Sequence, residues 1–192
     1  MKMMKTLKLL FAVAILLATT HTYSQTNQVD TDKSSVKWEG KKIGGSHNGA
    51  ILLKEGSFTL KGSKITEGTF IIDMASISNA DIEDKDYKAK LIGHLKSDDF
   101  FSVEKYPTAT LKVTGSTAFK NDIAKVTGDL TIKGQTHPID FEVSKNGHIF
   151  TTQLTVDRAQ YDIRYGSKSF FDNLGDKVIY DDFTLDISIV TK

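Results

Sequence analysis

Apolar and polar residues alternate with a period of two over most of the chain from Ser34 onward. Because successive side chains of a strand point to opposite faces, this period predicts strands with one buried and one solvated face. Apolar residues of one parity recur in the stretches 36–40, 58–60, 70–74, 109–113, 130–132, 139–143, 154–156 and 183–189. The pattern therefore predicts an all-β domain of about eight strands.

Turn residues separate the predicted strands, in the segments KGSK (61–64), KND (120–122), KGQTHP (133–138) and KNGH (145–148). Asn146 and Gly147 give the strongest turn signal, since a type I′ hairpin needs positive φ at both central residues. Short connections of this kind join neighbouring strands in antiparallel fashion. We therefore expect either one sheet closed into a barrel or a two-sheet sandwich.

The segment 78–96 breaks the period-two pattern and predicts the one helix. Ser78 and Asp81 have the spacing of a capping box at its start. A narrow apolar stripe at helical spacing contains Tyr87, Leu91, His94 and Leu95. A single short helix beside an eight-stranded sheet can lie across one open end of a barrel, and we expect it there.

Two adjacent aromatic residues, Phe100 and Phe101, follow this helix directly after Asp98 and Asp99. Both cannot lie on a narrow apolar stripe. We expect at least one of them to turn inward over the barrel mouth while the two aspartates face solvent. The alternative is that both rings pack the helix onto the outside of the sheet.

The amino-terminal residues predict a secretory signal peptide over residues 1–24. Three lysines precede an apolar run, Leu9–Ala18, that is too short for an ordinary membrane-spanning helix, and small residues follow near Ser24. We expect cleavage between Ser24 and Gln25, with a periplasmic or secreted location for the mature protein.

The rest of the chain predicts a flexible segment, 25–33, followed by one β-barrel domain, 34–192. The chain contains no cysteine, so neither a disulfide nor a lipidated thiol is available, and we expect no membrane anchor. The formal net charge of +1 becomes −2 when Lys2, Lys5 and Lys8 are removed with the signal peptide. Without a long basic run, a nucleic-acid partner is not expected.

Three stretches in order, HLKSDDFFSVEKYPTATL (94–111), VTGDLTIKGQTHPIDFEV (126–143) and DRAQYDI (157–163), closely resemble the YceI-like family of exported lipid-binding proteins. The similarity runs from about Val29 to Val190. It implies a lipocalin-like eight-stranded barrel that holds a polyisoprenoid or another long apolar chain. Segment 165–182 departs from the family pattern because it is longer and more aromatic, and it is a candidate second cover for the cavity.

The resemblance and the alternation together predict which residues contact the lipid. They are Trp38, Phe58, Phe70, Ile72, Leu95, Phe100, Phe101, Leu111, Leu130, Ile132, Phe141, Arg158, Tyr161, Ile163, Phe170, Phe171 and Phe183. The expected ligand is a polyisoprenoid, an isoprenoid quinone precursor or a fatty-acid derivative. No cofactor is expected, and a homodimer is an open possibility.

Two other functions remain open at this point. The large aromatic side chains could fill the barrel completely, which would make the protein a structural or protein-interaction module with Phe170 and Phe171 as the contact. A weaker alternative is an enzyme of lipid or quinone metabolism.

Catalytic and metal-binding patterns give little support to an enzyme. The histidines after the signal peptide (His47, His94, His137 and His148) have no paired metal spacing. The resemblance points to a histidine near position 47, where a structural hydrogen bond at the barrel mouth is the expected role. The acidic run 81–86 lacks the glycine and terminal glutamate of a calcium loop, so it is interpreted as a solvated helix start. No nucleophile motif occurs. We therefore predict a protein without catalytic residues.

Arg158 is the most informative charged residue in the sequence. It shares the parity of Leu154 and Val156, so a continuing strand would direct its guanidinium into the interior. A guanidinium can bind the phosphate or carboxylate of a lipid head group with two hydrogen bonds. The alternative is a structural ion pair with a loop aspartate such as Asp157 or Asp162.

Overall fold

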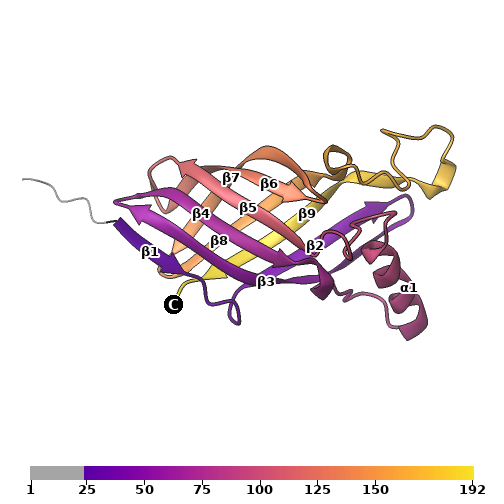
Figure 1. Ribbon diagram of the computed structural model, residues 1–192, viewed down its shortest axis with the longest axis horizontal. Coiled ribbons are helices and arrows are strands. Elements are labelled where there is room, and N and C mark those ends of the chain that lie inside the picture. The colour runs from indigo at the N-terminus through magenta and orange to yellow at the C-terminus, as the bar shows by residue number, and fades with distance from the viewer. Residues whose placement is uncertain (1–23) are drawn as a thin grey trace, which may run out of the picture.

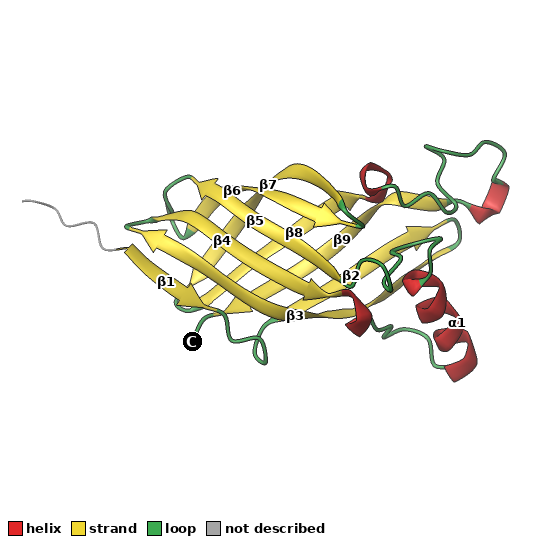
Figure 2. Cartoon of the chain, viewed as in Figure 1, coloured by secondary structure: helices red, strands yellow, loops and turns green. Residues whose placement is uncertain are grey.

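A computed structural model of the protein describes residues 24–192, which form one antiparallel sheet, one α-helix and three short 3₁₀ turns (Figures 1 and 2). The strands are β1 (Ser24–Gln28), β2 (Ser35–Lys42), β3 (Gly45–Lys61), β4 (Lys64–Asp73), β5 (Thr108–Ser116), β6 (Ile123–Ile132), β7 (Gln135–Asn146), β8 (Ile149–Asp157) and β9 (Ile179–Val190). The helix is α1 (Lys85–Lys96), and the turns are η1 (Met74–Ser76), η2 (Arg158–Tyr161) and η3 (Gly175–Lys177). The predicted signal peptide lies outside the described residues except for Ser24.

Eight strands, β2 to β9, close into a barrel. Each strand from β3 to β9 pairs with the next along the chain, and β9 pairs with β2, which in turn pairs with β3. All of these pairings are antiparallel. The prediction of an eight-stranded antiparallel barrel with one helix is confirmed, and the two-sheet sandwich is excluded because the ring is closed.

Strand β1 is a ninth strand outside the ring. Its residues pair with Ser57–Lys61, the end of β3 that extends past the region paired with β2. Residues 24–28 thus form a strand where the sequence predicted a flexible segment, 25–33. The side chains of β1 are polar and mostly exposed, so they carry no apolar alternation, and only the backbone pairing identifies the strand.

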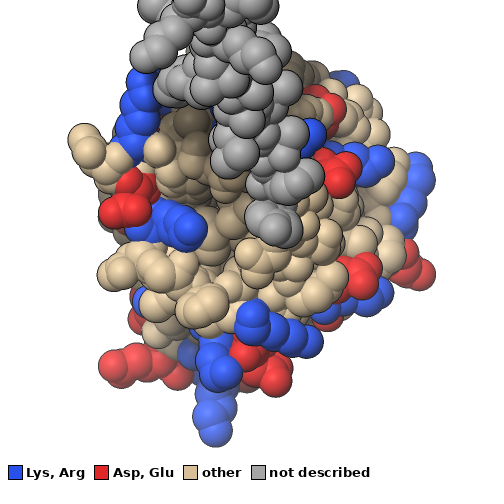
Figure 3. Space-filling model, turned by 90° about the vertical axis from the view of Figure 1, so that its left-hand side faces the viewer, with Lys and Arg blue, Asp and Glu red and all other residues tan. Residues whose placement is uncertain are grey.

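The period-two pattern reflects inward-facing side chains. In β6, for example, Ala124, Val126, Leu130 and Ile132 are buried and alternate with more exposed residues. At the barrel end far from α1, the rings of Phe58, Phe70 and Phe150 contact one another, with centroids 6.2 and 4.8 Å from that of Phe58. This aromatic cluster closes that end of the interior. Figure 3 views the same end from outside, where acidic and basic side chains are interspersed.

The hairpin turns differ in type from the prediction. The β7–β8 turn has Gly147 and His148 at its centre, and only Gly147 has positive φ (59°), as expected for a type II′ turn. Both central residues have positive φ in the β6–β7 turn, at Lys133 (49°) and Gly134 (75°). The rest of the predicted turn 133–138 belongs to β7.

The backbones of the neighbouring strands β7 and β8 are largely unpaired, and this boundary is called the β7–β8 seam below. Within residues 24–192, the β7–β8 ladder is limited to Ser144–Asn146 with Ile149–Thr151, although β7 pairs with β6 from Gln135 to Ser144. The closing pair Asn146–Ile149 places the N–H groups of even-numbered β7 residues toward β8. Pro138 is one of these residues and has no N–H to donate, which is consistent with an unpaired strand edge.

Helix α1 begins at Asp84 and not at the predicted capping box. The Asp84 carboxylate accepts a hydrogen bond from the Tyr87 amide at 2.8 Å, which caps the first turn. Ser78 lies well before the helix, where its hydroxyl donates to the Ala50 carbonyl. Asp81 bonds to the loop and to β3, as described below. The helix predicted within the segment 78–96 is thus confirmed over Lys85–Lys96.

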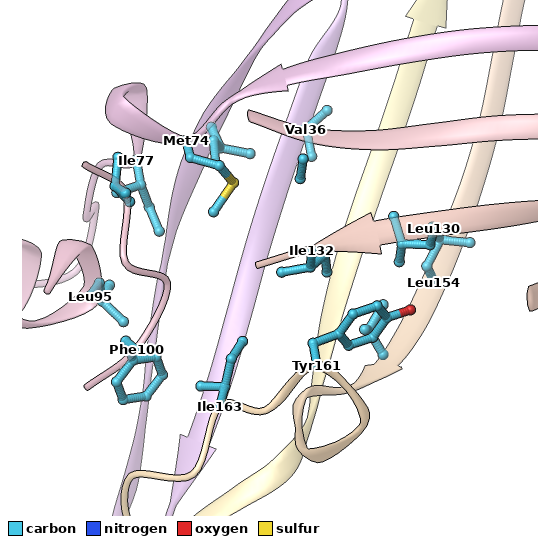
Figure 4. Close-up of a cluster of buried hydrophobic side chains, with 14 residues drawn as sticks. Val36, Met74, Ile77, Leu95, Phe100, Leu130, Ile132, Leu154, Tyr161 and Ile163 are labelled. Atoms are coloured by element: carbon cyan, nitrogen blue, oxygen red, sulfur yellow. The ribbon is translucent and has the colours of Figure 1, made fainter. Parts of the chain in front are cut away.

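Phe100 and Phe101 both turn toward the interior after α1. Phe100 is buried and Phe101 is half-buried, with ring centroids 5.8 Å apart. The chain reverses here because the Phe101 amide bonds to the Leu95 carbonyl (3.2 Å) and the Val103 amide to the Lys96 carbonyl (2.9 Å). Figure 4 shows Leu95 and Phe100 in the same cluster as Met74 and Ile77, which lie on the connection from β4 to α1. The segment therefore covers the barrel end.

Candidate functional site

The barrel encloses a cavity of about 510 Å³. This volume falls in the range of small-molecule binding sites. Most residues of the predicted lipid-binding set lie on its wall: Trp38, Phe58, Phe70, Ile72, Leu95, Phe100, Phe101, Leu111, Leu130, Ile132, Phe141, Arg158 and Phe183. They come from strands all around the ring and from the α1 segment, so the wall is almost entirely apolar. The cavity also rules out a barrel filled completely by its own side chains.

Four residues of the predicted set do not reach this wall. Tyr161 and Ile163 are 2% and 0% exposed and pack within the core around η2, because β8 ends at Asp157 and the strand parity is lost there. Phe170 and Phe171 are 38% and 49% exposed. Tyr165, which lies in the same long loop before β9 as Phe170 and Phe171, does line the cavity.

Other wall residues were not in the predicted set. Most of them lie in the alternating stretches identified in the sequence but were left out of the predicted contact set: Val36, Met74, Val113, Val143, Leu154, Leu185, Ile187 and Ile189. Leu53, on β3, lies outside those stretches. His94, Tyr165, Lys41, Lys42 and Lys90 also line the cavity. His94 and Lys90 lie on α1 and Tyr165 in the loop before β9, where no strand period applies, while Lys41 and Lys42 are the last two residues of β2.

Arg158 lies on the cavity wall, but its hydrogen bonds go to the protein. The side chain is 3% exposed and donates to the carbonyls of Tyr180 (3.2 Å), Ile163 (2.8 Å) and Ile179 (3.0 Å). Its Nη2 also lies 3.2 Å from Oδ1 of Asp181 as an ion pair. A structural ion pair was the alternative left open by the sequence, with Asp157 or Asp162 as candidates. The partner is Asp181, on the neighbouring strand β9.

The environment of Arg158 leaves its charge balanced inside the protein. Burial lowers the pKa of the guanidinium, while the negative charges of Asp181 and Asp157 act in the opposite direction. An arginine remains protonated despite such a shift because its ordinary pKa is above 12. Three backbone carbonyls accept hydrogen bonds from the guanidinium, and the Asp181 carboxylate forms an ion pair with it. Little capacity remains for a head group.

His47 forms a second polar contact at the α1 end of the cavity. Its Nδ1 lies 2.8 Å from Oδ2 of Asp81, whose Oδ1 accepts from the Asn48 amide (2.8 Å) and from Asn79 Nδ2 (2.6 Å). Burial alone would raise the pKa of Asp81, but the hydrogen bonds from Asn48, His47 and Asn79 lower it to about 2. These contacts tie the segment before α1 to β3.

The charged residues on the cavity wall have one sign. Lys41, Lys42, Lys90 and Arg158 line the cavity, and no aspartate or glutamate of the described chain does so. The three lysines are exposed, which places them where the cavity meets solvent, near α1 and the β2–β3 turn. Lys41 pairs with Glu39 (3.6 Å) and Arg158 with Asp181, so Lys42 and Lys90 are the wall cations without an ion pair among the described residues.

Residues 24–192 contain no cluster of three or more histidine or acidic side chains suited to a metal ion. In the same part of the chain, no helix has the length and apolar character needed to cross a membrane.

The profile of the YceI-like domain matches residues 28–191, nearly all of the described chain. The chain belongs to the YceI-like domain family. Among its curated relatives is a UPF0312 protein of Pseudomonas putida (strain W619), 32% identical over 116 residues, or 58% of this chain and 56% of that protein. A UPF0312 protein of Vibrio cholerae is 39% identical over 80 residues, or 38% and 42% of the two chains. The chain thus spans about half the length of these relatives.

Solved structures share the fold of this YceI-like chain. BcnA of Burkholderia cenocepacia superposes with a TM-score of 0.64 at 24% identity, covering 85% of this chain and 99% of BcnA. A polyisoprenoid binding domain of Saccharophagus degradans superposes with a TM-score of 0.60 at 18% identity, covering 86% and 97% of the two chains. At these identities the similarity establishes the barrel fold.

Proposed function

We propose that this YceI-like protein is an exported, non-catalytic carrier that holds one long apolar lipid inside its barrel. The observation that carries the proposal is the apolar cavity of about 510 Å³, which is large for a protein core that side chains normally fill. Proposed ligands are a polyisoprenoid, an isoprenoid quinone precursor or a fatty-acid derivative. The polyisoprenoid binding domain of S. degradans, which has the same fold, supports the isoprenoid choice.

Burial of the chain is sufficient to supply the affinity. Each buried CH₂ group contributes about 0.8 kcal/mol, before the cost of ordering the ligand is subtracted. A chain of isoprene or acyl units can therefore be held by the barrel wall without a reacting group. Arg158, the most deeply buried charge on the wall, is engaged with backbone carbonyls and Asp181, an arrangement that stabilises structure and leaves no base or nucleophile there.

Native mass spectrometry tests the carrier. The protein is purified from its producing cells without added lipid and examined intact, and an organic extract of the same sample is then analysed by mass. We expect a bound species whose mass matches the extracted lipid. The proposal fails if the protein carries no ligand and also takes none up from lipid vesicles.

A matched pair of variants locates the ligand inside the barrel. Ala109 is buried on the cavity wall, whereas Lys112 on the same strand is exposed. Ala109→Trp fills part of the cavity and should abolish the bound mass, while Lys112→Trp adds the same ring outside and should retain it. Equal ligand occupancy in both variants would place the lipid elsewhere.

Export is a separate part of the proposal and has its own test. The basic start, the apolar run Leu9–Ala18 and the small residues near Ser24 support it. Amino-terminal sequencing of the protein from the cell envelope or the medium should begin at or near Gln25. An intact Met1 on the soluble protein would reject export and leave the carrier function standing.

A further inference from the structure

His94 has a buried nitrogen that the protein itself does not satisfy. The residue lies on α1 and lines the cavity, and its Nε2 is buried without a hydrogen-bond partner among residues 24–192. The ring contacts two aromatic residues edge-on, Phe100 at 5.4 Å and Tyr165 at 4.4 Å between centroids. Buried polar atoms in native proteins are nearly always paired, so an unpaired atom on a residue of the cavity wall points to a partner that the protein does not supply.

The surroundings of His94 define the chemistry of that group. The charged residues on the cavity wall, Lys41, Lys42, Lys90 and Arg158, are all cations, and no carboxylate of the described chain joins them. Glu39 and Asp181 balance the charges of Lys41 and Arg158, but Lys42 and Lys90 have no ion pair among the described residues. A hydrogen-bond acceptor with partial or full negative charge is therefore favoured at this end over a donor such as an amine. An oxygen acceptor requires His94 to carry its proton on Nε2.

Two other polar side chains on the wall, Arg158 and His47, already have partners within the protein. Arg158 bonds to three backbone carbonyls and pairs with Asp181, and His47 bonds to Asp81 through Nδ1. His94 Nε2 thus combines burial, a place on the wall and a free hydrogen-bonding position. The opposite end of the interior, around Phe58 and Phe150, is aromatic and suits the tail of a chain.

We infer that His94 Nε2–H donates a hydrogen bond to an oxygen at one end of the bound lipid and so fixes its direction, with the polar end under α1 and the chain along the barrel. The class of ligand is an apolar chain with a terminal hydroxyl, carbonyl or phosphate oxygen. This inference rests on the carrier function proposed above and adds a polar contact to it.

Binding of matched probes tests the contact. Protein stripped of lipid is titrated with geranylgeraniol, with geranylgeranyl phosphate and with the hydrocarbon of the same skeleton that lacks oxygen. Wild-type protein should bind the two oxygenated probes more tightly than the hydrocarbon. His94→Phe should lose this preference, with about a tenfold weaker affinity for geranylgeraniol and an unchanged affinity for the hydrocarbon. His94→Gln, which keeps an N–H donor, should restore part of it.

His137→Phe is the control for the substitution itself. His137 also contacts an aromatic ring, Tyr161 at 5.1 Å, but does not line the cavity, so this variant should keep the preference. Titration with geranylgeranyl phosphate shows whether His94 or the rim lysine Lys90 contacts the oxygen of the ligand. If only the phosphate is preferred, and the preference disappears in Lys90→Gln but not in His94→Phe, the polar contact is made by the rim lysine and the inference is overturned.

A direct measurement does not depend on any variant folding. Nitrogen-15 spectra of the histidine rings should show His94 as the Nε2–H tautomer, with a shift on binding geranylgeraniol that the hydrocarbon does not produce. Equal affinity of wild-type protein for alcohol and hydrocarbon, with no such shift, would overturn the inference while leaving the carrier intact. Failure of the wild-type protein to bind any of the three probes would instead reject the carrier function and, with it, this contact.

Discussion

Arg158 bonds to backbone carbonyls of two segments that are distant in sequence, one after β8 and the other at the start of β9. The planar guanidinium can bond to three carbonyls and a carboxylate at once, which a lysine ammonium cannot do with the same geometry. At the scale of single residues, this side chain joins the two segments that lead into and out of the long aromatic loop. Its first effect is therefore on stability.

Arg158→Leu should lower the free energy of unfolding by about 3–5 kcal/mol, because Asp181 and three carbonyls lose their partner. Arg158→Lys should lose less, since it keeps the charge. Urea denaturation measures both, and Arg164→Leu is the control because its ion pair with Asp162 is exposed and should contribute less than about 1 kcal/mol. Unchanged stability with weaker binding of anionic lipids only would instead assign Arg158 to the head group.

Asp81 should make the free energy of unfolding depend on pH. Its pKa falls from the ordinary 3.8 to about 2 in the folded protein, so its stabilising effect is complete above about pH 4 and declines as the pH falls toward 2. In Asp81→Asn this part of the pH dependence should be absent. Urea unfolding of both proteins between pH 2 and 6 provides the measurement, and parallel stability curves over that range would contradict the assignment.

Helix α1 and the residues after it form the cover of the barrel. Leu95, Phe100 and Phe101 all line the cavity, so this element separates the apolar interior from solvent. Its short length and capped start at Asp84 do not make an isolated helix stable. Packing on the barrel end must supply that stability, and the cover is therefore coupled to what the barrel contains.

Phe101→Asp should weaken ligand retention more than it lowers the melting temperature, because Phe101 is only half-buried and faces the cavity. Phe171→Asp makes the same change at an exposed ring off the cavity wall and should leave retention unchanged. Retention is measured as the rate of transfer of a preloaded lipid to vesicles. A large loss of stability with normal retention would show that the ring only packs the helix.

The β7–β8 seam should be visible in hydrogen exchange. Odd-numbered amides of β8 point toward β7, so those of Gln153 and Thr155 lack a strand partner among the described residues, while Thr151 is paired with Ser144. We expect the first two to exchange faster than Thr151 and than Leu154, whose amide points toward β9. Uniform protection along β8 would show that the seam is closed in solution.

At the scale of the whole molecule, the cavity links stability to occupancy. Side chains that line an empty cavity lack van der Waals contacts on one side, and a bound ligand can supply them. A ligand that binds only the folded state adds about 2.7 kcal/mol at a free concentration of one hundred times its Kd. Calorimetry should therefore show a lower melting temperature for lipid-stripped protein, recovery on reloading with geranylgeraniol, and no recovery for Ala109→Trp. Equal melting temperatures with and without lipid would contradict this.

Much of the barrel was predictable because alternation is a local property of the chain. A strand with one solvated and one apolar face has a period of two, and this period identified Leu130 and Ile132 of β6, the inward residues of β9 and many other residues of the cavity wall. The position of α1 and the inward turn of Phe100 followed from a change of period and from two adjacent rings. Val36, Met74 and Val143 belong to the same alternating stretches and line the cavity, although the predicted contact set left them out.

Only the tertiary structure decided the features that depend on backbone pairing and on which distant groups meet. Strand β1 has polar side chains and is identified only by its backbone pairing with Ser57–Lys61 of β3. The gap between β7 and β8 arises because their backbone pairing stops after three residue pairs. Asp181 meets Arg158 because β8 and β9 are neighbours in the ring. His94 lost its hydrogen-bond partners because residues from α1, the following turn and the loop before β9 bury its ring together. Burial of this kind is a property of the assembled chain, since no local pattern records which distant side chains exclude water from a given atom.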